Sequence, residues 1–139
     1  MTARVRFIEQ SEILDVLRRS PVGEIPGAER TMYDCLRLSK VIWAGEIDGK
    51  VVCAFGVIQP QILFDQAYLW LLHTDAVEQH KFVFIRNSQV VVEALLEHYN
   101  PLVGYADIKN HKGIRWLKWL GAEFGKPEGL RIPFVIRRK

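Results

Sequence analysis

Hydrophobic and polar residues alternate at the start of the chain. Val5, Phe7 and Glu9 alternate with Arg6 and Ile8, which is the two-residue period of a strand. A helical period follows at once, so the pattern predicts a strand and then a helix.

Two helices are predicted between this strand and residue 40. Ser11 offers an N-cap oxygen to the first helix, and Pro21 prevents that helix from continuing. Its apolar residues are Ile13, Leu14 and Leu17. Residues 21–27 are expected to form a loop. The second helix carries on one face Met32, Cys35, Leu36 and Ser39.

The hydrophobic period returns to two residues from Val41. Apolar runs at 41–44 and 51–55 flank Ile47-Asp48-Gly49-Lys50, and Asp-Gly favours the positive φ angles of a tight hairpin turn. A third strand is expected at 67–74, after the Gln59-Pro60 break. This segment is apolar almost throughout, as in a strand that is covered on both faces.

The remaining pattern predicts a helix, a strand, a second helix and one or two terminal strands. The first helix covers about residues 80–99 and ends at Asn100-Pro101, with Val83, Val90, Val91, Ala94 and Leu95 on its buried face. A strand follows at 102–108. Asn110 then opens a helix that ends at Gly121, and the apolar face of this helix carries Ile114, Leu117 and Leu120. In the last strand, 130–136, Pro133 favours an edge or a bulge.

Together these elements predict a single α/β (α+β) domain over residues 1–139. Its core is a mixed, mostly antiparallel sheet with helices on both faces. The 139 residues, 49% hydrophobic and 25% charged, suit one continuous hydrophobic core.

Composition also excludes several classes of function. A formal charge of +3 from scattered basic and acidic residues does not form the basic stripe that nucleic acid requires. Cys35 and Cys53 lie far apart with no zinc-ligand spacing, so no metal site is expected. The first ten residues carry charges, and no segment has about 20 apolar residues, so no signal peptide or membrane span is expected.

The order of elements resembles the GNAT superfamily of N-acetyltransferases. Three stretches carry the likeness: AGEIDGKVVC at 44–53, the strand, loop and helix at 69–96, and NHKGIRWLKWLGA at 110–122. The resemblance implies the GNAT fold and an acyl-CoA-dependent ancestry.

A narrower likeness is to the small internal virion protein of short-tailed, coliphage-like podoviruses. LLEHYNPL at 95–102 and GIRWLKWLGAEF at 113–124 carry it. It implies a phage-encoded protein whose partners are other virion or assembly proteins, with self-association as a further option. Such a protein would occupy the host cytoplasm during assembly and then the virion interior.

The coenzyme-binding turn of the GNAT family maps to Gln79-His80-Lys81-Phe82-Val83-Phe84. The resemblance implies coenzyme contacts at Gln79, His80 and Lys81, and at Asn110, which is also a good N-cap. Two positions that are small in active members hold Phe82 and Phe84. Both rings are expected to stand where the pyrophosphate approaches the backbone amides of the helix start.

The catalytic residues of the family are matched only in part. The tyrosine that usually protonates the leaving thiolate aligns with Leu117, which has no proton to give. His73, beside Asp75 at the end of the central strand, is the candidate general base, because histidine has an ordinary pKa of about 6.5.

Three functions therefore compete. The sequence favours a non-catalytic virion or assembly protein, a pseudoenzyme with no cofactor. The alternative is an active N-acetyltransferase that binds acetyl-CoA through a degenerate turn, and a ligand-binding or nucleic-acid-binding module ranks last. Trp116 and Trp119, three residues apart on one helix, predict at least one exposed indole for partner contact.

Overall fold

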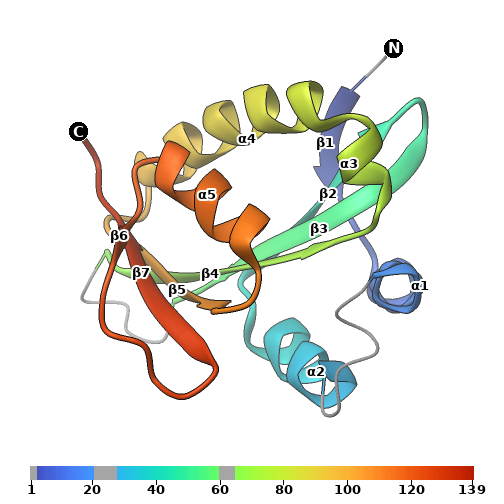
Figure 1. Ribbon diagram of the computed structural model, residues 1–139. Coiled ribbons are helices and arrows are strands. Elements are labelled where there is room, and N and C mark those ends of the chain that lie inside the picture. The colour runs from blue at the N-terminus through green and yellow to red at the C-terminus, as the bar shows by residue number, and fades with distance from the viewer. Residues whose placement is uncertain (1–2, 21–27, 60–64) are drawn as a thin grey trace. The chain divides into compact units, whose positions relative to one another are not determined.

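A computed structural model describes residues 3–20, 28–59 and 65–139, and its elements follow the predicted order with one addition (Figure 1). The first half contains β1 (Ala3–Phe7), α1 (Gln10–Arg19), α2 (Ala28–Leu38), β2 (Val41–Ile47), β3 (Lys50–Ile58) and β4 (Ala67–His73). The second half contains α3 (Ala76–Gln79), α4 (Lys81–Leu96), β5 (Leu102–Asp107), α5 (His111–Trp119), β6 (Glu123–Phe124) and β7 (Arg131–Ile136). The addition is the short helix α3. The predicted loop at 21–27 and Pro60 lie outside the described residues.

Contacts divide the chain into two compact units. The first comprises Met1–Ile58 and Trp70–Phe84, and the second Gln59–Leu69 and Ile85–Lys139. Strand β4 contributes residues to both, and the strand order is β1-β2-β3-β4-β5-β7-β6. All the strand pairs with a described register are antiparallel except β4 with β5, which confirms a mixed, mostly antiparallel sheet.

The β2–β3 hairpin of the first unit forms as predicted. Ile47 pairs with Lys50 across a two-residue turn, in which Asp48 has φ 52° and Gly49 has φ 81°. Positive φ at both central residues is the geometry that Asp-Gly adopts most readily.

Helix α1 begins two residues earlier than predicted, so Ser11 is not its N-cap. Glu9 occupies that position without a side-chain capping bond, and its carbonyl accepts the amide of Glu12 at 3.1 Å. The buried face of α1 consists of Ile13, Val16 and Leu17. Since Ser11 lies within the first turn, its hydroxyl cannot cap the helix start.

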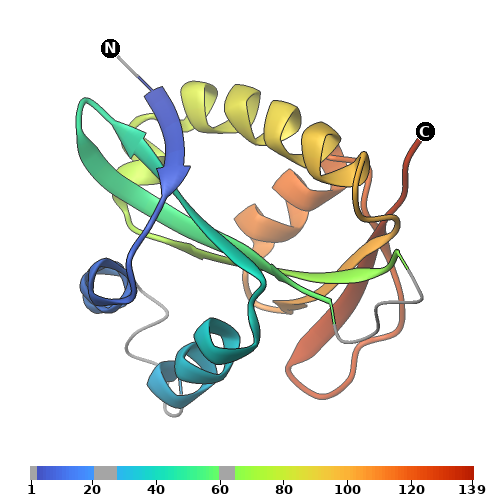
Figure 2. The same cartoon turned by 180° about the vertical axis from the view of Figure 1, so that it is seen from behind.

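Helix α2 buries Met32 and Leu36, two of the residues predicted for its inner face. Just beyond its end, the Ser39 hydroxyl accepts a hydrogen bond of 2.7 Å from Trp70 Nε1 on β4 and donates to the Cys35 carbonyl. Both α1 and α2 pack on β3, and α3 lies on the opposite side of that strand (Figures 1 and 2). The first unit therefore has helices on both faces of its strands.

Cys53 lies in a buried cluster of the first unit with Ile47 and Val52. A Cβ atom placed on Gly45 would lie 2.6 Å from the Cys53 sulfur, so glycine is required at position 45 on the neighbouring strand. Burial raises the pKa of the Cys53 thiol to about 11. The side chain therefore stays a neutral thiol inside this core.

In the second unit, β4 and β5 pair in parallel at Ala67 with Leu102 and Tyr68 with Val103. Strand β7 pairs with β5 over its whole length and with the two-residue β6 at Phe134 and Val135. Pro133 therefore lies in an interior strand, in a register without a shift against β5, and the prediction of an edge or a bulge is wrong. Because β6 is so short, the missing N–H of Pro133 interrupts little pairing.

Helix α4 presents only part of the predicted face: Leu95 is buried and Val83 packs against the core cluster, as expected. Val92, Leu95 and Leu96 are buried, whereas Val90 is 62% exposed and Ala94 is also exposed. The run Val90-Val91-Val92 fits two helical stripes that differ by one residue position, and packing selects the one that contains Val92, Leu95 and Leu96. Helix α5 lies on the same side of β5 and β7 as α4 (Figures 1 and 2). Trp116 Nε1 of α5 donates a hydrogen bond of 2.9 Å to the Ser88 hydroxyl of α4.

Candidate functional site

Strand β4 ends at His73, and its end is fixed by Thr74. The Thr74 amide and hydroxyl both donate to the Val52 carbonyl, at 2.9 and 3.0 Å, and the Thr74 side chain is buried. His73 is half-buried, with Nδ1 3.4 Å from the Thr74 carbonyl. The candidate base is therefore a half-buried residue at the end of β4.

The predicted coenzyme turn is made of two consecutive helices. Gln79 is the last residue of α3, and His80 breaks the helical geometry with φ −125° and ψ 37°. The first backbone bond of α4 runs from the Phe84 amide to the His80 carbonyl, at 3.0 Å. Lys81 and Phe82 therefore lie in the first turn of α4, whose amides have no carbonyl partner within the helix.

This helix start has the electrostatic character of an anion site. The partial positive charge at the N-terminus of the 16-residue α4 attracts anions, and the exposed Lys81 adds a full charge. Gln79 is exposed beside it, whereas His80 is half-buried. Within the described part of the chain, His80 Nδ1 is buried and has no hydrogen-bond partner.

Phe84 does not stand at the helix start, contrary to expectation. Its half-buried ring packs against the core cluster of Ile47, Val52 and Cys53. The reason is helical geometry: Phe84 lies one turn into α4, on the side that faces the sheet. Phe84 is therefore a half-buried residue that packs against the core of the first unit, and its ring is directed to that cluster rather than to the start of α4.

Phe82 has the opposite environment. Its side chain is 79% exposed, and the Lys81 ammonium lies 5.9 Å from the ring centroid. An aromatic ring with so much exposed surface is not fixed by packing and can change rotamer. Its Cβ atom, by contrast, is held in place by the backbone of the first turn of α4.

Asn110 caps α5. Its side-chain oxygen accepts the Gly113 amide at 3.0 Å, and a Cβ atom on Gly113 would collide with the Asn110 side chain. The capping role is therefore established by geometry, while a coenzyme contact from Asn110 stays a prediction. Asn110 belongs to the second unit, whereas His73, Gln79, His80 and Lys81 belong to the first.

Leu117 is 6% exposed in the middle of α5. A side chain at this position points into the core of the second unit. Trp119, on the same helix, is 52% exposed, which confirms the prediction that at least one of the two α5 indoles reaches solvent.

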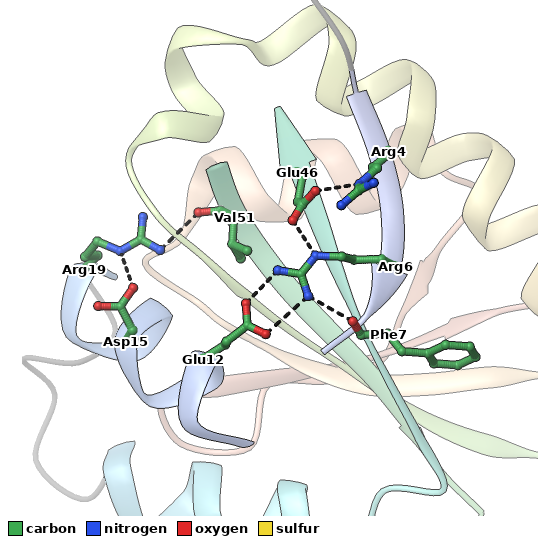
Figure 3. A network of polar contacts seen from close by, with 8 residues as sticks. All are labelled: Arg4, Arg6, Phe7, Glu12, Asp15, Arg19, Glu46 and Val51. Carbon is green, nitrogen blue, oxygen red and sulfur yellow. Dashed lines mark hydrogen bonds and ion pairs between the residues drawn. The ribbon is translucent and has the colours of Figure 1, made fainter. Parts of the chain in front are cut away.

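An ionic network in the first unit was not predicted from the sequence (Figure 3). Glu46 on β2 has a side chain only 4% exposed, and it accepts hydrogen bonds from Arg4 at 2.7 Å and from Arg6. Arg6 also donates to Glu12 of α1 at 2.6 Å. The sequence signal was the spacing of Arg4 and Arg6, which places both guanidinium groups on one face of a strand.

The network shifts the protonation of its members. Hydrogen bonds from Arg6, and then from Arg4, lower the pKa of Glu46 below its ordinary value. The Arg6 hydrogen bond lowers the pKa of Glu12 in the same way. Both glutamates are therefore anionic at neutral pH, and the network ties β1, β2 and α1 together.

Among the residues that the structure describes, no group of three or more His, Cys, Asp and Glu side chains is placed to hold a metal ion. No described helix has the length and apolar character needed to cross a membrane.

No protein-family model and no curated protein sequence matches the chain. Several solved structures, however, are similar to the chain. Protein PH1933 from Pyrococcus horikoshii is similar with a TM-score of 0.76 at 11% identity, over 99% of both chains. A ribosomal-protein alanine N-acetyltransferase from Escherichia coli gives 0.74 at 13% identity, over 98% of this chain and 94% of that one.

A third similar structure is the GNAT domain of an S. lividans protein, PAT. Its TM-score is 0.71 at 15% identity, over 99% of this chain and 92% of that one. These comparisons establish the GNAT fold, in agreement with the predicted fold class. At such low identity they establish the fold alone.

Proposed function

We propose that the chain is an acyl-CoA-dependent N-acyltransferase with a degenerate pyrophosphate-binding turn. The observation that carries the proposal is the packing of the half-buried Phe84 against the cluster of Ile47, Val52 and Cys53, which directs one of the two rings away from the start of α4. The names of several similar structures, including the Escherichia coli N-acetyltransferase, support the same reaction class.

The residues of the first unit suit this role. The first-turn amides of α4 at Lys81 and Phe82 would hold the pyrophosphate, with the Lys81 ammonium adding charge. Gln79 and His80 flank that turn. The exposed Phe82 ring can turn aside, but its Cβ atom limits the approach and lowers the expected affinity.

The coenzyme would supply an acyl group activated as a thioester. His73 would take the proton that the amine loses as its nitrogen bonds to the acyl carbon and the carbon–sulfur bond breaks. Because Leu117 cannot donate a proton, the departing thiolate would be protonated by water. The absence of a positioned acid is expected to cost about 100-fold or more in rate.

A second candidate function is a non-catalytic virion or assembly protein. Two observations favour it: Leu117 is a core residue where an acid is expected, and Trp119 offers an exposed indole suited to a protein contact. In this case no cofactor binds, and the partners are other virion proteins in the host cytoplasm and then in the virion interior.

Titration calorimetry with acetyl-CoA separates the two candidates. We expect wild-type binding in the range of about 10 to 1000 μM, and Phe82→Gly to bind about 10-fold more tightly because the Cβ obstacle is gone. Phe84→Gly is the matched control. It should bind no more tightly than wild type and should unfold more easily, because it leaves a cavity beside Cys53.

Thiol release with a panel of primary amines then tests the reaction. Amine-dependent release that falls in His73→Gln, at unchanged acetyl-CoA affinity, would support His73 as the base. If neither wild type nor Phe82→Gly binds at about 1 mM, where weak specific sites still register, the enzyme proposal fails. Copurification with phage particles would then test the second candidate.

A further inference from the structure

Strand β1 leaves one edge without a strand partner in the described part of the chain. It stands first in the strand order, and its side chains are mostly exposed, including Val5 at 44% and Phe7 at 72%. Exposed edges carry unpaired N–H and C=O groups that can extend a sheet. This edge therefore has the chemistry of a strand-binding site.

An aromatic ladder runs across the sheet toward this edge. Phe7, Trp43 and Phe55 lie opposite one another on β1, β2 and β3. Their ring centroids are 6.4 Å and 5.4 Å apart, and each pair is inclined by 22°. Figure 3 shows the Phe7 ring directed away from the ionic network. The ladder thus ends in a ring whose outer side faces solvent.

The two faces of β1 differ in character. Ala3, Val5 and Phe7 alternate along one face, and Arg4 and Arg6 lie on the other. The two arginine charges are offset by Glu46 and Glu12 within the same unit. The arginine face is therefore neutral overall and does not call for an acidic partner.

We propose that β1 pairs antiparallel with β1 of a second copy of this chain. In the register centred on Val5, that residue meets Val5 of the second copy, and Phe7 meets Ala3. The large Phe7 ring then lies opposite the smallest side chain of the strand. On the other face Arg4 lies opposite Arg6 of the second copy, and each guanidinium group keeps its carboxylate partner, Glu46 or Glu12, within its own chain.

Two features set the size and the strength of this association. A two-fold pairing uses the free β1 edge of each copy, so the pair closes as a dimer and does not continue into a fibre. The strand has only five residues, so the contact area is small. Interfaces below about 1,000 Å² are typically weak, and the dimer is expected only at high protein concentration.

Analytical ultracentrifugation from about 10 to about 500 μM, the range for weak interfaces, tests the proposal. Wild type should shift from monomer to dimer across this range. Val5→Lys should weaken the dimer at least about 10-fold, because two buried valines become opposed charges. Val90→Lys is the matched control, since Val90 is also exposed, at 62%, and it should dimerise like wild type.

A cysteine cross-link tests the register even if Val5→Lys unfolds. Directly opposed residues in antiparallel strands have Cα atoms about 4.5 to 5.5 Å apart, within reach of a disulfide. Mild oxidation should therefore link Val5→Cys into a covalent dimer, and leave Val90→Cys and wild type unlinked.

Three results would overturn the proposal. They are a wild type that stays monomeric throughout, a dimer that Val5→Lys leaves unchanged, and cross-linking that is no faster for Val5→Cys than for Val90→Cys. None of these measurements involves acetyl-CoA, so they stand apart from the test of enzymatic function.

Discussion

At the residue scale, Asn110 and Gly113 form one coupled unit at the start of α5. The capping bond requires the Asn110 oxygen to approach the Gly113 amide, and that approach leaves no space for a Cβ atom at position 113. The two identities therefore depend on each other, although glycine in a helix is otherwise unfavourable.

A double-mutant cycle should measure this coupling. Asn110→Ala is expected to lower the free energy of unfolding by about 1 kcal/mol, the usual value of an N-cap. Gly113→Ala should destabilise the wild type because it displaces the cap. In the Asn110→Ala background the same change should be neutral or stabilising, because alanine favours the helix. Urea denaturation of the four proteins gives the result, and additive effects would argue against the coupling.

Single side chains were the least predictable level of this molecule. Phe84 was expected at the coenzyme turn and Ser11 at a helix cap, and both were misplaced because sequence spacing does not fix where a helix begins or which face packs. The burial of Leu117 and the capping role of Asn110 were predictable from local signals. Leu117 belongs to an apolar stripe of its helix, and Asn110 directly precedes the helix start.

At the element scale, the β2–β3 hairpin was the most predictable feature. Asp-Gly specifies the turn through backbone conformation alone, without help from distant contacts. Helix α3 was missed because four residues carry no periodic pattern. The buried face of α4 was misjudged because Val90, Val91 and Val92 satisfy more than one stripe.

The hairpin turn gives a direct prediction. A Cβ atom on Gly49 would meet no atom within 4 Å, so any cost of a side chain comes from φ 81° and not from collision. Gly49→Val should lower the free energy of unfolding by about 1 to 2 kcal/mol or more. Gly49→Asn should cost less, because Asn tolerates positive φ. Equal denaturation midpoints for the two variants would contradict this account.

At the scale of the whole molecule, stability should depend on pH through the ionic network. In the unfolded chain Glu46 and Glu12 return to their ordinary pKa of 4.5. Because both pKa values are lower in the folded state, the stabilisation is complete above that value and is lost as the pH falls through the lowered values.

Thermal unfolding between pH 7 and pH 3 would check this dependence. The wild-type midpoint should fall below about pH 4.5, and Glu46→Gln should start lower at pH 7 and fall less steeply. Asp15→Asn removes only the exposed pair with Arg19, which contributes little, so its slope should match wild type. A Glu46→Gln slope equal to wild type would show that the network does not control acid stability.

The fold as a whole was predictable because its signals are distributed along the chain. Alternation, hairpin chemistry and helix stops recur in every segment, so a local error such as the one at Ser11 does not alter the class. The candidate site depends on a few positions, chiefly His73, Phe82 and Phe84, whose roles follow from burial that only three-dimensional packing determines.

The buried thiol of Cys53 has a practical consequence. The thiolate is the form of cysteine that reacts as a nucleophile with alkylating reagents, and in the folded chain burial raises the pKa of Cys53 to about 11 and also raises that of Cys35. Cys53 should therefore gain an adduct only during openings that admit water between β2 and β3. Its alkylation rate, followed by mass spectrometry, would report the free energy of those openings, as amide exchange does for the backbone.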